Sequence, residues 1–94
     1  MKSYFEAKNL EELCALMGLP KTEAPKLRIR LDLAKAIRHS VEKKSLTHAE
    51  ASSKTGVGRT VITAIMNGNL DKISTDRLID IAQALGLKLH LKVA

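Results

Sequence analysis

Apolar residues recur at helical intervals through the middle of the chain. Between Pro25 and Lys44 every fourth position is aliphatic, at Ile29, Leu33, Ile37 and Val41. A spacing of four places these side chains on one face of a helix. Pro25 stands near the first turn, where its missing amide costs nothing. The pattern predicts a helix over residues 25–44.

Capping signals predict two shorter helices, one before and one after this helix. Asn9 followed by Glu12 reads as a capping box, and an apolar stripe follows it at Leu10, Leu13, Cys14 and Met17. Thr47 followed by Glu50 is a second capping box, which opens a helix to about Lys54. In such a box each of the two residues satisfies a free amide of the first helical turn.

Two more helices complete the predicted bundle of five. Gly58 precedes a helix over residues 59–66, although glycine is a weaker cap than the serine or threonine common at such a position. Ser74 caps the last helix, whose buried stripe is Leu78, Ile81, Ala82 and Leu85. Gly86 ends this helix, because glycine readily adopts the left-handed conformation that follows a helix C-terminus.

The chain then changes period. Residues 87–93 alternate strictly, with Leu87, Leu89, Leu91 and Val93 on one face. This alternation predicts a half-buried strand, and no other part of the sequence offers it a partner strand. The economical solution is antiparallel pairing with the same strand of a second copy across a two-fold axis. The alternative is a tail packed on its own helices.

Charge divides the chain unevenly. Residues 1–25 contain three basic and four acidic residues, whereas residues 26–94 contain 13 basic and 6 acidic ones. A basic region of this kind suits a polyanionic partner or a solubilising surface. Tyr4 and Phe5 are the only aromatic residues, so the basic region lacks the stacking platforms that bind single-stranded nucleic acid. A duplex is therefore the better candidate.

The central motif, THAEASSKTGVGRTVITAIMNG over residues 47–68, consists of two short helices joined at a glycine turn. Ala51 and Ser52 are small enough for the second helix to cross closely, and the Ser52 hydroxyl can bond back to a helix carbonyl. Gly56 allows a positive φ at the turn. Val57, Ile62 and Ile65 are expected to hold the second helix on the core. Such a pair is a helix-turn-helix, whose second helix enters the major groove of DNA.

Residues 27–86 resemble the Cro/repressor-like (Xre) family of DNA-binding proteins. The run GNLDKISTDRLIDIAQALGLKLHLKV further resembles the HigA-type antitoxins of type II toxin–antitoxin pairs. The resemblance implies an all-α, five-helix Cro/lambda-repressor-like helix-turn-helix domain with a C-terminal β-strand that pairs across a dimer. It also implies a palindromic DNA operator and a small toxin partner of HigB/RelE type.

The resemblance also implies roles for individual residues. Those expected to face base edges are Arg59, Thr60, Thr63 and Ala64. Those expected to reach phosphates are His48, Lys54, Asn67, Lys43 and Lys44. His48 stands where relatives usually carry glutamine, and a histidine at this place could make the phosphate contact sensitive to pH. Those expected to bind a toxin are Tyr4, Phe5, Leu10, Leu13 and Met17, although the same stripe could instead cover the chain's own helices.

Other classes of function find no support in the sequence. His39, His48 and His90 do not fall at metal-ligand spacing with Cys14, and no nucleophile, base and orienting acid are grouped. We therefore expect no catalytic residues, no metal and no cofactor. The lone cysteine and the absence of a long apolar run lead us to expect a cytoplasmic protein without a membrane segment.

The predicted organisation has three parts: an N-terminal segment over residues 1–25, a helix-turn-helix domain over 26–86 and a dimerisation strand over 87–94. The predicted function is that of an antitoxin that represses its own operon. Two alternatives remain, a freestanding bacterial or phage regulator of the Xre family and a protein-binding adaptor that no longer binds DNA.

Overall fold

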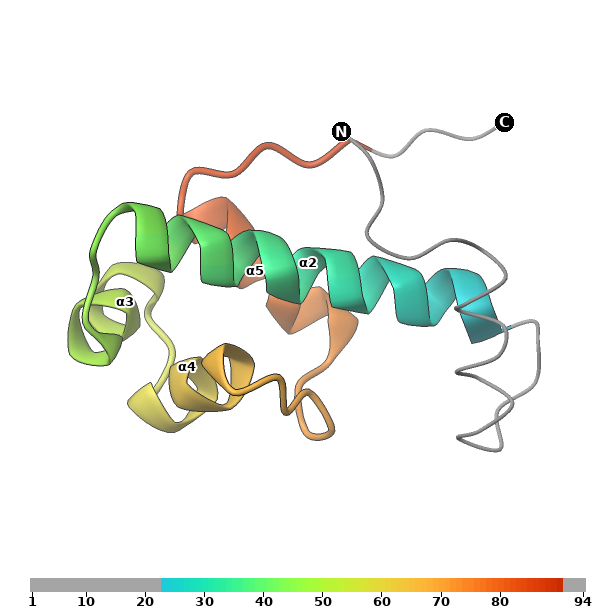
Figure 1. The fold of residues 1–94 in the computed structure, drawn as a ribbon, viewed down its shortest axis with the longest axis horizontal. Coiled ribbons are helices and arrows are strands. Elements are labelled where there is room, and N and C mark those ends of the chain that lie inside the picture. Colours follow the sequence, from blue (N-terminus) through green and yellow to red (C-terminus); the bar gives the residue numbers. More distant parts are fainter. Residues whose placement is uncertain (1–22, 91–94) are drawn as a thin grey trace. The chain divides into compact units, whose positions relative to one another are not determined.

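The computed structural model describes residues 23–90, and this part of the chain is helical. Its helices are α2 (Ala24–Lys43), α3 (His48–Thr55), α4 (Arg59–Met66) and α5 (Thr75–Ala84) (Figure 1). The chain divides into two units, Met1–Asp32 and Leu33–Ala94, and α2 contributes residues to both.

Local signals set the helix boundaries. Ser74 accepts a hydrogen bond from the Arg77 amide at the start of α5. At the end of α5, Gly86 has a φ of 84°, and the Leu87 amide donates to the Ala82 carbonyl. This is the Schellman arrangement, in which a left-handed residue lets the chain leave the helix while the last carbonyls stay bonded.

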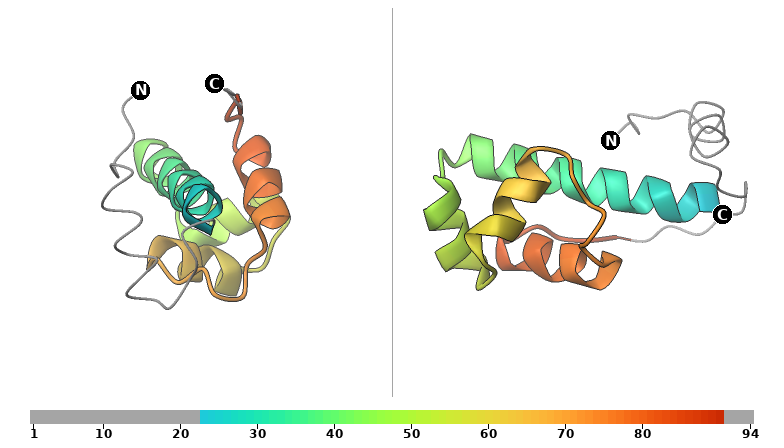
Figure 2. Two further views of the ribbon diagram at one scale, coloured as in Figure 1. Left: turned by 90° about the vertical axis from the view of Figure 1, so that its right-hand side faces the viewer. Right: turned by 90° about the horizontal axis from the view of Figure 1, so that it is seen from below.

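The larger unit has a core of aliphatic side chains from all four helices. The largest side chains that are almost completely buried are Ile37, Val41, Ile62, Ile65, Leu78, Ile81 and Leu85, and α3 contributes the fully buried Ala51. The left view of Figure 2 shows the C-terminal part of α2 together with α4 and α5 around this shared interior. Each fully buried aliphatic side chain contributes about 1.5–3 kcal/mol to folding, so the core fixes the positions of the short helices α3 and α4.

The described part of the smaller unit has its own apolar contact. Ala24 is buried, and Leu27 and Leu31 of the same helix pack against it. Ile29, on another face of α2, is 42% exposed.

The structure confirms the helices predicted over residues 25–44, 47–54, 59–66 and 74–85, each to within a residue or so at either end. The helix predicted around Leu10–Met17 lies outside the described residues. The predicted C-terminal strand is not seen in the described residues: residues 87–90 have no regular secondary structure, and residues 91–94 lie outside the described part. Since the predicted partner strand belongs to a second copy, residues 23–90 of a single chain offer residues 87–90 no strand to pair with.

Candidate nucleic-acid interface

A complete capping box holds the start of α3. The Glu50 amide donates to Thr47 Oγ1 at 3.0 Å, and the Thr47 amide donates to Glu50 Oε1 at 2.9 Å. The hydrogen bond from the Thr47 amide to the carboxyl, and then the contact of the Thr47 side chain with it, lower the pKa of Glu50 below its ordinary value of 4.5, against an opposing effect of desolvation. His48 therefore begins the helix at a well-defined place.

Side chains of α3 lock the turn between α3 and α4. Gly56 has a φ of 77°, and its amide donates to the Ser52 carbonyl at 2.9 Å. The Ser52 hydroxyl donates forward to the Val57 carbonyl at 2.5 Å. The prediction that Ser52 bonds back to a helix carbonyl is therefore wrong: its acceptor lies in the turn. This hydrogen bond ties the end of α3 to the turn, so serine at position 52 helps to fix the path into α4.

Helix α4 has one buried face and one open face. Ile62 and Ile65 are fully buried, while Arg59 and Thr60 are exposed in the first turn. Thr63 and Ala64, one turn later, are half-buried, and Asn67 beyond the end of the helix is exposed. No side chain caps α4 at Gly58, which confirms the weak cap. The residues predicted to face base edges thus occupy the side of α4 away from the core.

Two residues assigned to different roles contact each other directly. His48, at the start of α3, lies with its Nδ1 2.8 Å from Oγ1 of Thr63 on α4. Both side chains are half-buried. The predicted phosphate-contacting residue and a predicted base-contacting residue therefore form one hydrogen-bonded pair, which the sequence gives no means of foreseeing.

Two basic side chains of the α2 region bind helix ends. Arg38 Nη1 donates to the Ile65 carbonyl near the end of α4 at 3.2 Å. Lys44 Nζ donates to the Leu85 carbonyl at the end of α5 at 2.5 Å. A cation at a helix C-terminus is favourable, since the free carbonyls there carry partial negative charge. The ammonium group of Lys44, predicted to reach a phosphate, is thus engaged within the protein.

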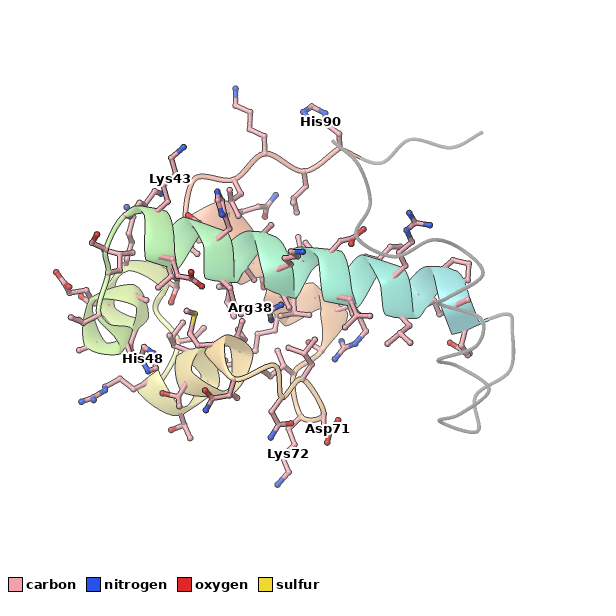
Figure 3. All side chains as sticks on the ribbon, in the orientation of Figure 1. Arg38, Lys43, His48, Asp71, Lys72 and His90 are labelled. Carbon is pink, nitrogen blue, oxygen red and sulfur yellow. The ribbon has the colours of Figure 1, made fainter. Side chains whose placement is uncertain are left out.

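The remaining basic candidates, Lys43 and Lys54, are both exposed. Figure 3 shows Lys43 projecting from α2 away from the side on which His48 and Lys72 lie. Lys43 is exposed, but it does not share a side with α4 and His48. Lys54, in the last turn of α3, is exposed.

Lys72 is a candidate that the sequence analysis missed. It is exposed in the loop between α4 and α5, next to the exposed Asp71 (Figure 3). The signal for it was available, because Lys72 is the only basic residue between the predicted end of one helix at Asn67 and the cap of the next at Ser74.

The sequence of the chain from residue 16 to residue 94 matches the model of a helix-turn-helix domain family. The chain belongs to this family. The match includes every element from α2 to α5, and it makes this helix-turn-helix protein a candidate DNA-binding regulator. No curated protein and no solved structure matches the chain.

The described residues include no helix with the length and apolar character needed to cross a membrane. Within the same range, this helix-turn-helix protein has no group of three histidine, cysteine or acidic side chains arranged to hold a metal ion.

Proposed function

We propose that the protein is a sequence-specific repressor that places α4 in the major groove of double-stranded DNA. One observation carries this proposal: Arg59 and Thr60 are exposed on the first turn of a helix whose opposite face, at Ile62 and Ile65, is fully buried. A helix held in this way presents its first turn to a groove, as recognition helices do.

The chemistry of the open face suits base reading. The guanidinium fork of Arg59 matches O6 and N7 of guanine, and Thr60 can bond a base or contact a thymine methyl group. Ala64 offers only an apolar contact. His48, Lys54, Asn67 and Lys72 supply hydrogen-bond donors or charge for phosphates, which set affinity and salt dependence rather than sequence choice.

The test of this function is the Arg59→Ala variant. We expect it to weaken binding to a selected duplex by about 1–3 kcal/mol while binding to random duplex changes little, because a base contact is lost. Fluorescence anisotropy on both duplexes measures this difference. The matched control is Arg77→Ala, which removes an exposed arginine of α5. Equal weakening on both duplexes by Arg59→Ala would refute base reading by Arg59, and no binding to any duplex would favour the adaptor.

We further propose that the repressor acts as a homodimer on a palindromic operator and as the antitoxin of a small toxin of HigB/RelE type. The resemblance of residues 68–93 to HigA-type antitoxins supports this role. So does the different composition of residues 1–25, which carry a slight negative charge and both aromatic residues, Tyr4 and Phe5. Aromatic side chains are common anchors in protein interfaces.

Co-expression tests the toxin partner. We expect the intact chain to restore growth to cells that express the product of the neighbouring gene, and the double variant Tyr4→Ala/Phe5→Ala to lose this protection while its DNA affinity is unchanged. Protection that survives the double variant would move the toxin contact to other residues. A neighbouring product that is neither toxic nor bound would make the freestanding regulator the better account.

A further inference from the structure

The hydrogen bond between His48 and Thr63 joins the two helices of the motif on the side where DNA is proposed to bind. His48 is the first residue of α3, and Thr63 lies 15 residues later, on α4. Their atoms Nδ1 and Oγ1 are 2.8 Å apart, which is a normal hydrogen-bond length. Both residues are half-buried, so each keeps some surface open to a ligand.

The proton in this bond can lie on either side. A neutral imidazole has one nitrogen that donates and one that accepts, whereas a hydroxyl has one proton and two lone pairs. If Nδ1 accepts, the Thr63 hydroxyl donates its proton to His48, and Thr63 can then only accept a hydrogen bond from a base. If Nδ1 donates, the Thr63 proton is free and Thr63 can donate to a base.

Contact with a phosphate decides between these two states. Phosphate oxygens only accept hydrogen bonds, so the second ring nitrogen, Nε2, must carry the proton when it meets one. In the neutral ring this leaves Nδ1 as an acceptor. The Thr63 hydroxyl then points its proton at His48 and turns only lone pairs towards the groove.

We propose that His48 determines which bases Thr63 reads, by making its hydroxyl an acceptor. This inference rests on the proposed function, in which α4 lies in the major groove. The bases that present a donor there are adenine, through N6, and cytosine, through N4. Thr63 therefore selects adenine or cytosine at its position and disfavours guanine and thymine, and His48 acts as a positioning residue for that choice.

The experiment selects binding sites from a random duplex library with the intact chain. Preference at every position is then measured for the unmodified protein and for three variants. Thr63→Val removes the hydroxyl and identifies the position that Thr63 reads. His48→Gln keeps a donor near the place of Nε2 but loses the bond to Thr63. Thr60→Val is the matched control, since Thr60 is also on α4 and makes no bond to His48.

We expect the unmodified protein to prefer adenine or cytosine about fivefold at the position that Thr63→Val identifies, the effect of one hydrogen bond. His48→Gln reduces that preference to nearly equal use of the four bases, while the base preferences at the other positions are kept. Thr60→Val alters a different position only. Thr63→Ser, which keeps the hydroxyl, retains the preference, and thermal unfolding confirms that each variant folds.

Two results would overturn the inference while the proposed function stands: guanine or thymine preferred at the Thr63 position, or a preference there that His48→Gln leaves intact. A library that yields no enriched sequence would overturn both the inference and the proposed function. A general loss of affinity in His48→Gln, equal at all positions, would reduce His48 to a phosphate contact and also overturn the inference.

Discussion

Ser45 holds a backbone conformation that glycine holds at two comparable helix ends. The amide of Leu46 donates to the Val41 carbonyl around Ser45, as the amide of Asn69 does to the Ala64 carbonyl around Gly68. The φ of Ser45 is 53° and that of Gly68 is 79°. Left-handed backbone costs a residue with a Cβ about 1–2 kcal/mol, whereas glycine adopts it freely.

We expect Ser45→Gly to raise the free energy of unfolding by about 0.5–1 kcal/mol. The relief of left-handed strain exceeds the extra entropy that glycine adds to the unfolded chain, which is about 0.4–1 kcal/mol. Chemical denaturation measures the change. The reverse substitution at the matched position, Gly68→Ser, is expected to lower stability by a similar amount. A loss of stability in Ser45→Gly would show that the serine side chain contributes more than its backbone costs.

At the scale of the single helix, α3 depends on its capping box more than its length suggests. An isolated helix of eight residues is not stable in water, and α3 contributes only Ala51 to the buried core. The hydrogen bonds between Thr47 and Glu50 therefore matter for the orientation of His48, which begins the same turn.

We expect the stability of α3 to fall in acid because the pKa of Glu50 is lowered in the folded protein. A carboxyl with a lowered pKa stabilises the fold above its unfolded pKa, and this contribution is lost as the pH falls through the folded value. Thermal unfolding from about pH 6 to about pH 3 should show a shallower acid loss in Glu50→Gln than in the unmodified protein. Identical profiles would contradict the role of this carboxylate. Thr47→Ala should cost about 1 kcal/mol at neutral pH.

How well the sequence predicts a contact in this protein depends on how far apart the two residues are in the chain. The bounds of α3 and α5 follow from neighbours such as Thr47 with Glu50 and from Ser74, so they were predictable. The contacts of Arg38 with the Ile65 carbonyl and of Lys44 with the Leu85 carbonyl span 27 and 41 residues. They depend on how the helices cross, which periodicity does not determine. The sequence does not distinguish a lysine that caps a helix from a lysine that is free to bind a phosphate.

At the scale of the whole molecule, the residues after α5 connect the fold to its proposed assembly. Leu87 is half-buried, but Leu89 is 39% exposed in the single chain. An aliphatic side chain at alternate positions of an extended segment is typical of a strand with one covered face. Pairing of two such segments would cover Leu89 and give the proposed dimer two copies of α4 related by a two-fold axis.

We therefore expect Leu89→Ser to convert the dimer to a monomer, as measured by sedimentation velocity. Lys88→Ser, the same new residue on the opposite face, is the matched control and should remain dimeric.

Because two linked sites bind a palindrome with a high effective concentration for the second contact, the monomer should lose about 100-fold or more in affinity for the full operator. Its affinity for one half-site should be unchanged, since α4 is held by Ile62 and Ile65 within a single chain. If the Leu89→Ser variant is still a dimer, the two-fold contact lies elsewhere. If its affinity for a single half-site falls as much as its affinity for the full operator, Leu89 supports the fold of each chain rather than the pairing of two chains.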